Sequence, residues 1–119
     1  MREPIGSIID ILTQTWSSGT QEDKLAALSE AQEKLPDILK SMKEIPVPKI
    51  KEIKKILKLE IKALENYIKS CDYRVKYLKD QKPVDIHMAV IFTQETISYW
   101  HESAKKAKSF WANYSVPSK

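Results

Sequence analysis

Lysine is the residue with the greatest potential for binding in this 119-residue sequence, and it is concentrated in one stretch. Residues 49–82 carry eleven Lys or Arg against five Asp or Glu, whereas residues 1–48 carry five against eight. At 100° per residue, a set of these lysines falls on one side of a helix, where it could neutralise the phosphates of a nucleic acid. The set consists of Lys51, Lys55, Lys58, Lys62, Lys69 and Lys76.

The same lysines also have a purely structural explanation. A long amphipathic helix needs a soluble outer side, and the acidic segment that precedes the lysines could lie beside them and partly cancel their charge. Arg74 is the only one of the eleven cations with the planar fork that grips a phosphate or reads a guanine, and no helix-turn-helix or zinc module accompanies it. We therefore favour a solvated outer side and keep non-specific nucleic-acid binding as the alternative.

The two histidines and the single cysteine form no recognisable catalytic or metal-binding set. His87 and His101 lie fourteen residues apart in one predicted helix. That spacing is about 21 Å at the standard helical rise, so they cannot share a metal ion. Cys71 falls in an apolar stripe, which favours a small buried side chain over a nucleophile. The sequence therefore predicts no metal and no cofactor, and it favours a binding role over an enzymatic one.

Glu60 is a charged residue that falls inside the apolar arc of its predicted helix. An unpaired carboxylate in such a place is costly. The structural explanation is a boundary residue whose carboxylate reaches solvent or forms an ion pair with a lysine of a neighbouring helix, such as Lys24. The functional hypothesis is a polar core pocket at Glu60, which Trp16, Trp100 and Trp111 could wall.

Apolar residues at steps of three and four predict four helices that position these groups. The predicted ranges are 4–17, 21–44, 48–80 and 85–114. In the last of them the apolar stripe continues over four heptads. It comprises Ile86, Ala89, Thr93, Ile97, Trp100, Ala104, Ala107, Trp111 and Tyr114, with Phe92, Tyr99 and Phe110 widening the same face.

Several residues indicate where these helices begin and end. Thr20 and Asp23 have the spacing of a capping box, and Asp85 is the expected cap of the fourth helix. Gly19 is expected to end the first helix in the left-handed conformation. Pro36 lies inside the second helix, where the apolar stripe keeps its phase, so a kink is predicted rather than a break.

The predicted fold is all-α: a single domain, residues 1–119, forming an antiparallel up-and-down four-helix bundle. Two glycines in the whole chain are too few for an all-β protein rich in tight turns. With 42% hydrophobic and 30% charged residues, the composition is that of a folded globular chain. The two C-terminal helices have matching lengths, and we expect them to form a long hairpin with the first two packed alongside.

The expected partners are a second copy of the chain or another protein. A few apolar residues fall outside the main stripes and would form a second interface in a helix-pair homodimer. These interface candidates are Leu59, Tyr73, Tyr77, Met88 and Ile91. No apolar run approaches the ~20 residues that span a bilayer, and one cysteine without a possible internal partner fits a reducing compartment, so a cytoplasmic location is expected.

Overall fold

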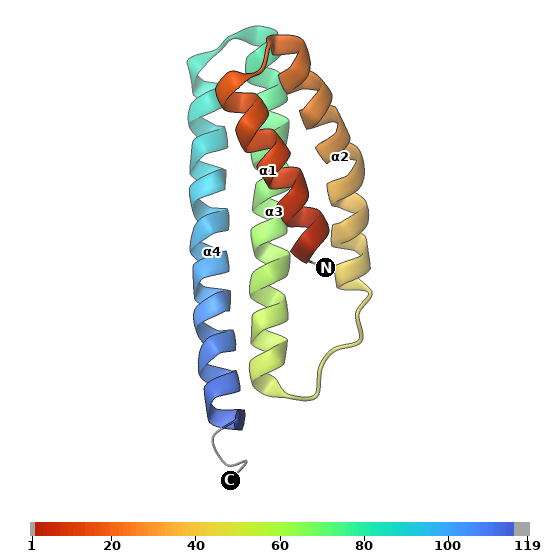
Figure 1. Cartoon of the computed structure of the whole chain (residues 1–119), viewed down its shortest axis with the longest axis vertical. Coiled ribbons are helices and arrows are strands. Elements are labelled where there is room, and N and C mark those ends of the chain that lie inside the picture. The colour runs from red at the N-terminus through yellow and green to blue at the C-terminus, as the bar shows by residue number, and fades with distance from the viewer. Residues whose placement is uncertain (1, 116–119) are drawn as a thin grey trace.

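The computed structural model describes the backbone of residues 2–115 and the side chains of residues 6–112. Four helices account for nearly all of this chain: α1 (Arg2–Ser18), α2 (Gln21–Lys43), α3 (Lys51–Asp80) and α4 (Pro83–Ser115). They run alternately up and down along the long axis of a bundle that measures 57 × 25 × 22 Å (Figure 1). The all-α bundle and its long α3–α4 hairpin are thus confirmed. The stripe residue Tyr114 lies outside the described side chains.

Local side-chain hydrogen bonds fix the start of α2 as the sequence predicts. The Thr20 hydroxyl accepts a hydrogen bond from the Asp23 amide at 3.1 Å, and the Asp23 carboxylate accepts one from the Thr20 amide at 3.1 Å. This reciprocal capping box satisfies two amides that the helix itself cannot satisfy. The helix then continues through Pro36 without a break up to Lys43.

Two predictions about helix ends were wrong in detail. Gly19 does not have a positive φ. It is needed instead because a Cβ atom at this position would lie 2.6 Å from the Thr15 carbonyl oxygen. Asp85 does not cap α4, because the helix already begins at Pro83, where a missing amide proton costs nothing. The residue in the left-handed conformation is Gln81, with φ of 56°, at the end of α3.

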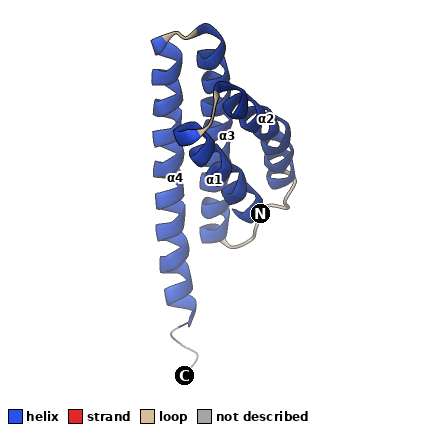
Figure 2. Cartoon of the chain, turned by 45° about the horizontal axis from the view of Figure 1, so that its top comes forward, coloured by secondary structure: helices blue, strands red, loops and turns tan. Residues whose placement is uncertain are grey.

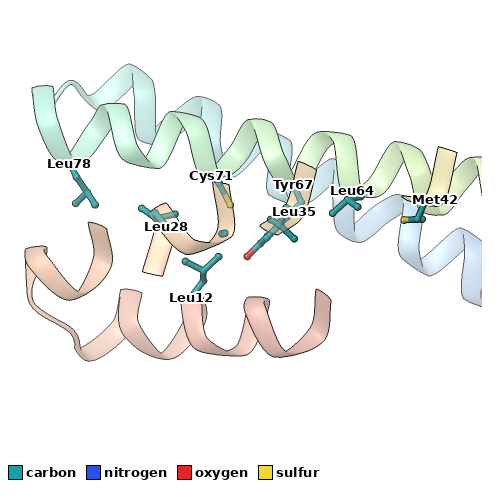
Figure 3. Close-up of a cluster of buried hydrophobic side chains, with 9 residues drawn as sticks. Leu12, Leu28, Leu35, Met42, Leu64, Tyr67, Cys71 and Leu78 are labelled. Carbon is teal, nitrogen blue, oxygen red and sulfur yellow. The ribbon is translucent and has the colours of Figure 1, made fainter. Parts of the chain in front are cut away.

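The main hydrophobic core lies among α1, α2 and α3 (Figure 3). Its central side chains project from the facing stripes of these helices and are almost completely removed from solvent. They are Leu12, Leu28, Ala31, Leu35, Met42, Leu64, Tyr67, Cys71 and Leu78. Burial of these apolar stripes is the principal force that holds α1 and α2 against α3.

The α3–α4 hairpin is held by a different kind of contact, a seam of small side chains. Ala63 and Ser70 of α3 and Ala89, Thr96 and Ser103 of α4 are each at most 1% exposed. Hydroxyl groups bond across this seam: Thr96 donates to the Ala63 carbonyl at 3.0 Å, and Ser70 donates to the Ala89 carbonyl at 2.9 Å. Small residues let the two backbones approach closely, and the hydroxyls satisfy their own hydrogen-bonding needs there.

The seam determines which face of α4 is buried, and this face differs from the one that the sequence predicts. The residues that α4 presents to α3 follow each other at every seventh position, from Ala89 through Thr96 and Ser103 to Phe110. Three members of the predicted stripe are instead turned to solvent: Ile97 is 47% exposed, Trp111 is 61% exposed, and Ala104 is exposed as well. The predicted stripe is therefore only partly the buried one.

The first helix does not close the bundle against the fourth. Among the described residues, Cα atoms of α4 come within 8 Å of α3 but of neither α1 nor α2. Figures 1 and 2 show α4 beside α3 at one edge of the bundle, with the shorter α1 lying across the middle of the molecule. The space between α1 and α4 is thus filled by side chains only in part. Within the described chain, no helix has the length and apolar character needed to cross a bilayer.

Candidate functional site

A mostly apolar groove of about 270 Å³ lies between α1 and α4. It exists because α1 rests on α2 while α4 rests on α3, so their facing side chains remain apart. The walls are formed by Ile9, Leu12, Thr13, Trp16 and Ser17 of α1 and by Thr93, Thr96, Ile97 and Trp100 of α4, and the floor by Leu28, Tyr67 and Arg74. All four helices contribute to this one concave surface, which makes it the principal candidate for a binding site.

Arg74 brings a positive charge to the floor of this groove. Its guanidinium carbon lies 4.7 Å from the centre of the Trp16 ring. One nitrogen donates a long hydrogen bond of 3.4 Å to the Thr93 hydroxyl. Partial burial lowers the pKa of the Arg74 guanidinium, because desolvation disfavours the charged form. In the described part of the chain, no carboxylate lies within ion-pairing distance of Arg74.

A short hydroxyl network holds the partner of Arg74 in place. The Thr93 hydroxyl donates to the Ala89 carbonyl at 2.9 Å and lies 2.6 Å from the Ser70 hydroxyl. Ser70 is completely buried in the α3–α4 seam. The guanidinium is therefore positioned by the rigid hairpin on one side and by the Trp16 ring of α1 on the other.

Cys71 and Tyr67 are buried groups that could titrate but are held in their neutral forms. Cys71 is 1% exposed, and burial raises the pKa of its thiol from 9.0 to about 12. Burial likewise raises the pKa of the Tyr67 hydroxyl. A thiol with so high a pKa is a poor nucleophile at neutral pH, so the geometry supports Cys71 as a core side chain.

Glu60 is not paired in the way the sequence suggested. Its carboxylate is half-buried and accepts a hydrogen bond of 2.9 Å from the Ser103 hydroxyl across the α3–α4 seam. Lys24, the expected partner, has its ammonium 5.0 Å from the centre of the Trp16 ring instead. Glu60 does not line the groove, whose walls include two of the three tryptophans, Trp16 and Trp100.

The six lysines of the predicted nucleic-acid surface are all exposed on the outer side of α3. Three of them lie over aromatic rings: Lys62 over Tyr99, Lys69 over Phe92, and Lys76 over Tyr73, at 5.5–5.9 Å. Among the described residues, none of these six lysines forms an ion pair with an acidic side chain of the preceding helix.

At the α2–α3 contact the acidic side chains belong to α3 and not to α2, the opposite of the arrangement that the sequence suggested. Lys43 of α2 pairs with Glu65 of α3 at 3.1 Å, and the Gln32 amide of α2 donates to the Asp72 carboxylate of α3 at 2.9 Å. Glu65 and Asp72 of α3 therefore face α2, and the lysine face of α3 remains open.

The five interface candidates are all half-buried rather than exposed. Tyr73 stacks on Phe92 of α4, with ring centres 5.7 Å apart, and Tyr77 packs against the main core. Leu59, Met88 and Ile91 are likewise intermediate in exposure. The chain itself thus covers part of the surface that the sequence suggested for a partner.

A second apolar surface on α4 was missed by sequence reasoning. Val90, Ile97, Ala104 and Trp111 follow each other at every seventh position, and all four are exposed; we call this set the α4 stripe. Val90 is 41% exposed, Ile97 47% and Trp111 61%. The sequence pattern places Ile97, Ala104 and Trp111 in the predicted core stripe and leaves Val90 out of it, because periodicity alone does not say which face a neighbour covers.

The remaining candidate residues bring no further chemistry together. His87 and His101 are both exposed on α4. Within the described residues, no three His, Cys, Asp or Glu side chains are grouped so that they could hold a metal ion.

The fold, the groove and the α4 stripe define a small helical bundle that is open along one side of its longest helix. Comparison of the chain with models of protein families, with curated proteins and with solved structures gives no match.

Proposed function

We propose that this protein is a non-enzymatic helical interaction module that associates with a second copy of itself through the α4 stripe. The observation that carries this proposal is the exposure of four small or apolar residues at strict heptad spacing along one face of α4. Seven residues is the period at which a helix presents the same position to a partner helix packed along it, and the stripe supplies one small or apolar residue in each such period. The cytoplasmic setting inferred from the single cysteine belongs to the same proposal.

Symmetry makes a second copy a suitable occupant. A two-fold axis across the middle of α4 would place the same stripe on both copies face to face, each covering the other. The residues that flank the stripe on its solvent side support close approach, because no acidic residue is among them and lysine is the only permanently charged one. They are His87, Gln94, His101 and Lys108, all of them exposed.

A charge placed in the α4 stripe should separate the two copies. Ala104 is exposed at the centre of the stripe, so Ala104→Glu is compatible with the folded chain but would bury an unpaired carboxylate in the interface. We expect sedimentation equilibrium to give twice the 13.8 kDa chain mass for the wild type, and a dissociation constant raised by about 10-fold or more for the variant.

Ser98→Glu provides the matched control for this measurement. Ser98 is exposed on the same helix but outside the stripe, so the added charge is the same while the interface is left intact. Association equal to that of the wild type is expected. A wild-type chain that remains monomeric from micromolar to millimolar concentration contradicts the proposal, and so does equal weakening by the two variants.

Non-specific nucleic-acid binding is kept as a second candidate because the lysine face of α3 is open. If it operates, Lys62→Gln combined with Lys69→Gln should weaken binding of single-stranded DNA in a fluorescence titration at low salt. The slope of log affinity against log salt should fall by about 0.7 for each phosphate that the variant no longer neutralises. Lys105→Gln with Lys108→Gln removes the same charge from exposed positions of α4. Absence of binding by the wild type at low salt excludes this function.

A further inference from the structure

We propose that the groove between α1 and α4 binds a small carboxylate with an apolar body, the carboxylate on Arg74 and the body between Trp16 and Trp100. This ligand site differs from the self-association surface proposed above, although Ile97 belongs to both. It is carried by the geometry of the groove and by the charge at its floor.

The first step of the argument concerns the guanidinium of Arg74. Arginine carries five N–H donors, and in the described chain Thr93 is the single acceptor that Arg74 reaches, at 3.4 Å. The usual N–H···O distance is about 2.9 Å, so even this hydrogen bond is weak. A partly buried cation gains most from an anion that can accept two parallel hydrogen bonds, and a carboxylate does so.

The second step concerns the charge around the groove. The Lys24 ammonium lies 5.0 Å from the centre of the same Trp16 ring that the Arg74 guanidinium approaches to 4.7 Å. Arg74 lines the groove and Lys24 lies outside its lining, but both cations lie near the same Trp16 ring. Among the residues that the structure describes, no acidic side chain lines the groove. Tyr67 also lines the groove, and its hydroxyl, whose pKa burial raises further above neutrality, carries its proton. The groove is complementary to negative charge.

The third step concerns size and polarity. A volume of about 270 Å³ lies just below the ~300–1,000 Å³ of pockets that hold drug-sized ligands, so the ligand is smaller than these. Apart from the donors on the floor, the walls are largely aliphatic and aromatic. Ile9 and Leu12 stand on the α1 side, and Ile97 and Trp100 on the α4 side. A medium-length aliphatic carboxylate matches both features.

The experiment compares three probes that share one apolar body: octanoate, 1-octanol and octyltrimethylammonium. Binding is followed by calorimetry and by tryptophan fluorescence, since Trp16 and Trp100 form walls of the groove. We expect octanoate to bind at least about 10-fold more tightly than the alcohol, because a charge-assisted hydrogen bond exceeds a neutral one. The cationic probe should bind more weakly than either.

Arg74→Gln tests the role of the guanidinium, and Lys76→Gln is its matched control. Both variants remove one positive charge from α3, but Lys76 is exposed on the outer side of the helix. We expect Arg74→Gln to abolish the preference for octanoate over octanol, with the octanol affinity unchanged, and Lys76→Gln to leave the preference intact. Circular dichroism and urea unfolding show whether each variant is folded.

Three results overturn the proposal: no octanoate binding by the folded wild-type chain, equal affinity for octanoate and octanol, or equal effects of the two variants. Repeating the titration with Ala104→Glu separates this site from self-association, because Ala104 does not line the groove. Octanoate binding by that variant in its monomeric form supports a ligand site even where the two copies have separated. Failure of the octanoate titration leaves the sedimentation result unaffected.

Discussion

Leu64→Ala is expected to lower the free energy of unfolding by about 2–5 kcal/mol, the range for truncating a fully buried leucine. The Leu64 side chain is 0% exposed and lies between Tyr67 and Met42 in the core cluster (Figure 3). Its truncation removes apolar packing between α2 and α3 and leaves a cavity that rigid helices cannot close. For a domain whose total stability is about 5–15 kcal/mol, this is a large fraction.

Urea unfolding followed by circular dichroism measures this decrease. Ile11→Ala is the control, since Ile11 is an apolar helical residue that is 50% exposed. Its truncation should change the free energy of unfolding by no more than about 0.5 kcal/mol. Equal effects of the two substitutions would contradict the core described above.

Above pH 9, the free energy of unfolding is expected to fall as the pH rises. Burial raises the pKa of Cys71 from 9.0 to about 12. Below pH 9 the thiol is protonated in both the folded and the unfolded chain, so its contribution to stability is fully present. Between pH 9 and about 12 only the unfolded chain releases the proton, and stability falls by about 1.4 kcal/mol per pH unit for each such group. Tyr67, whose pKa is also raised by burial, adds to the decline above pH 10.0.

Two variants separate the contributions of these groups. Cys71→Ala lowers stability at every pH because it weakens the packing of the core, but it should flatten the decline between pH 9 and 10. Tyr67→Phe should keep that first decline and reduce the later one. The measurement is urea unfolding at closely spaced pH values. A Cys71→Ala profile parallel to that of the wild type would show that the thiol ionises equally in the folded and unfolded states.

Much of the fold could be predicted because its causes are local. The Thr20 capping box, the continuous stripe of α2 through Pro36 and the long stripe of α3 each depend on residues a few positions apart. The all-α class and the long hairpin followed from these patterns. The ends of the helices could be predicted less well. Gly19 and Asp85 are residue types that occur both at helix ends and inside the first or last turn, so their type alone does not fix where a helix begins or ends.

The candidate sites could be predicted only in part. Arg74 stood out in the sequence by its chemistry, but its contact with Trp16 joins residues that are 58 positions apart. Glu60 is recognisable in the sequence as an unusual charge, yet it accepts a hydrogen bond from Ser103 of α4 instead of pairing with Lys24. Both contacts depend on the relative rotation of whole helices, which the pattern of a single helix does not contain.

By itself, the sequence determined four helices, their order, and the positions of the apolar and lysine-rich faces on the third. Tertiary structure alone decided which face of α4 is covered, and that α1 rests on α2 without reaching α4. The physical reason is the seam of alanine, serine and threonine, whose small side chains draw α4 close to α3 with its heptad-spaced Val90, Ile97, Ala104 and Trp111 turned outward. The pattern of large apolar residues predicts a different buried face for α4, whereas the small residues determine how this longest helix is oriented.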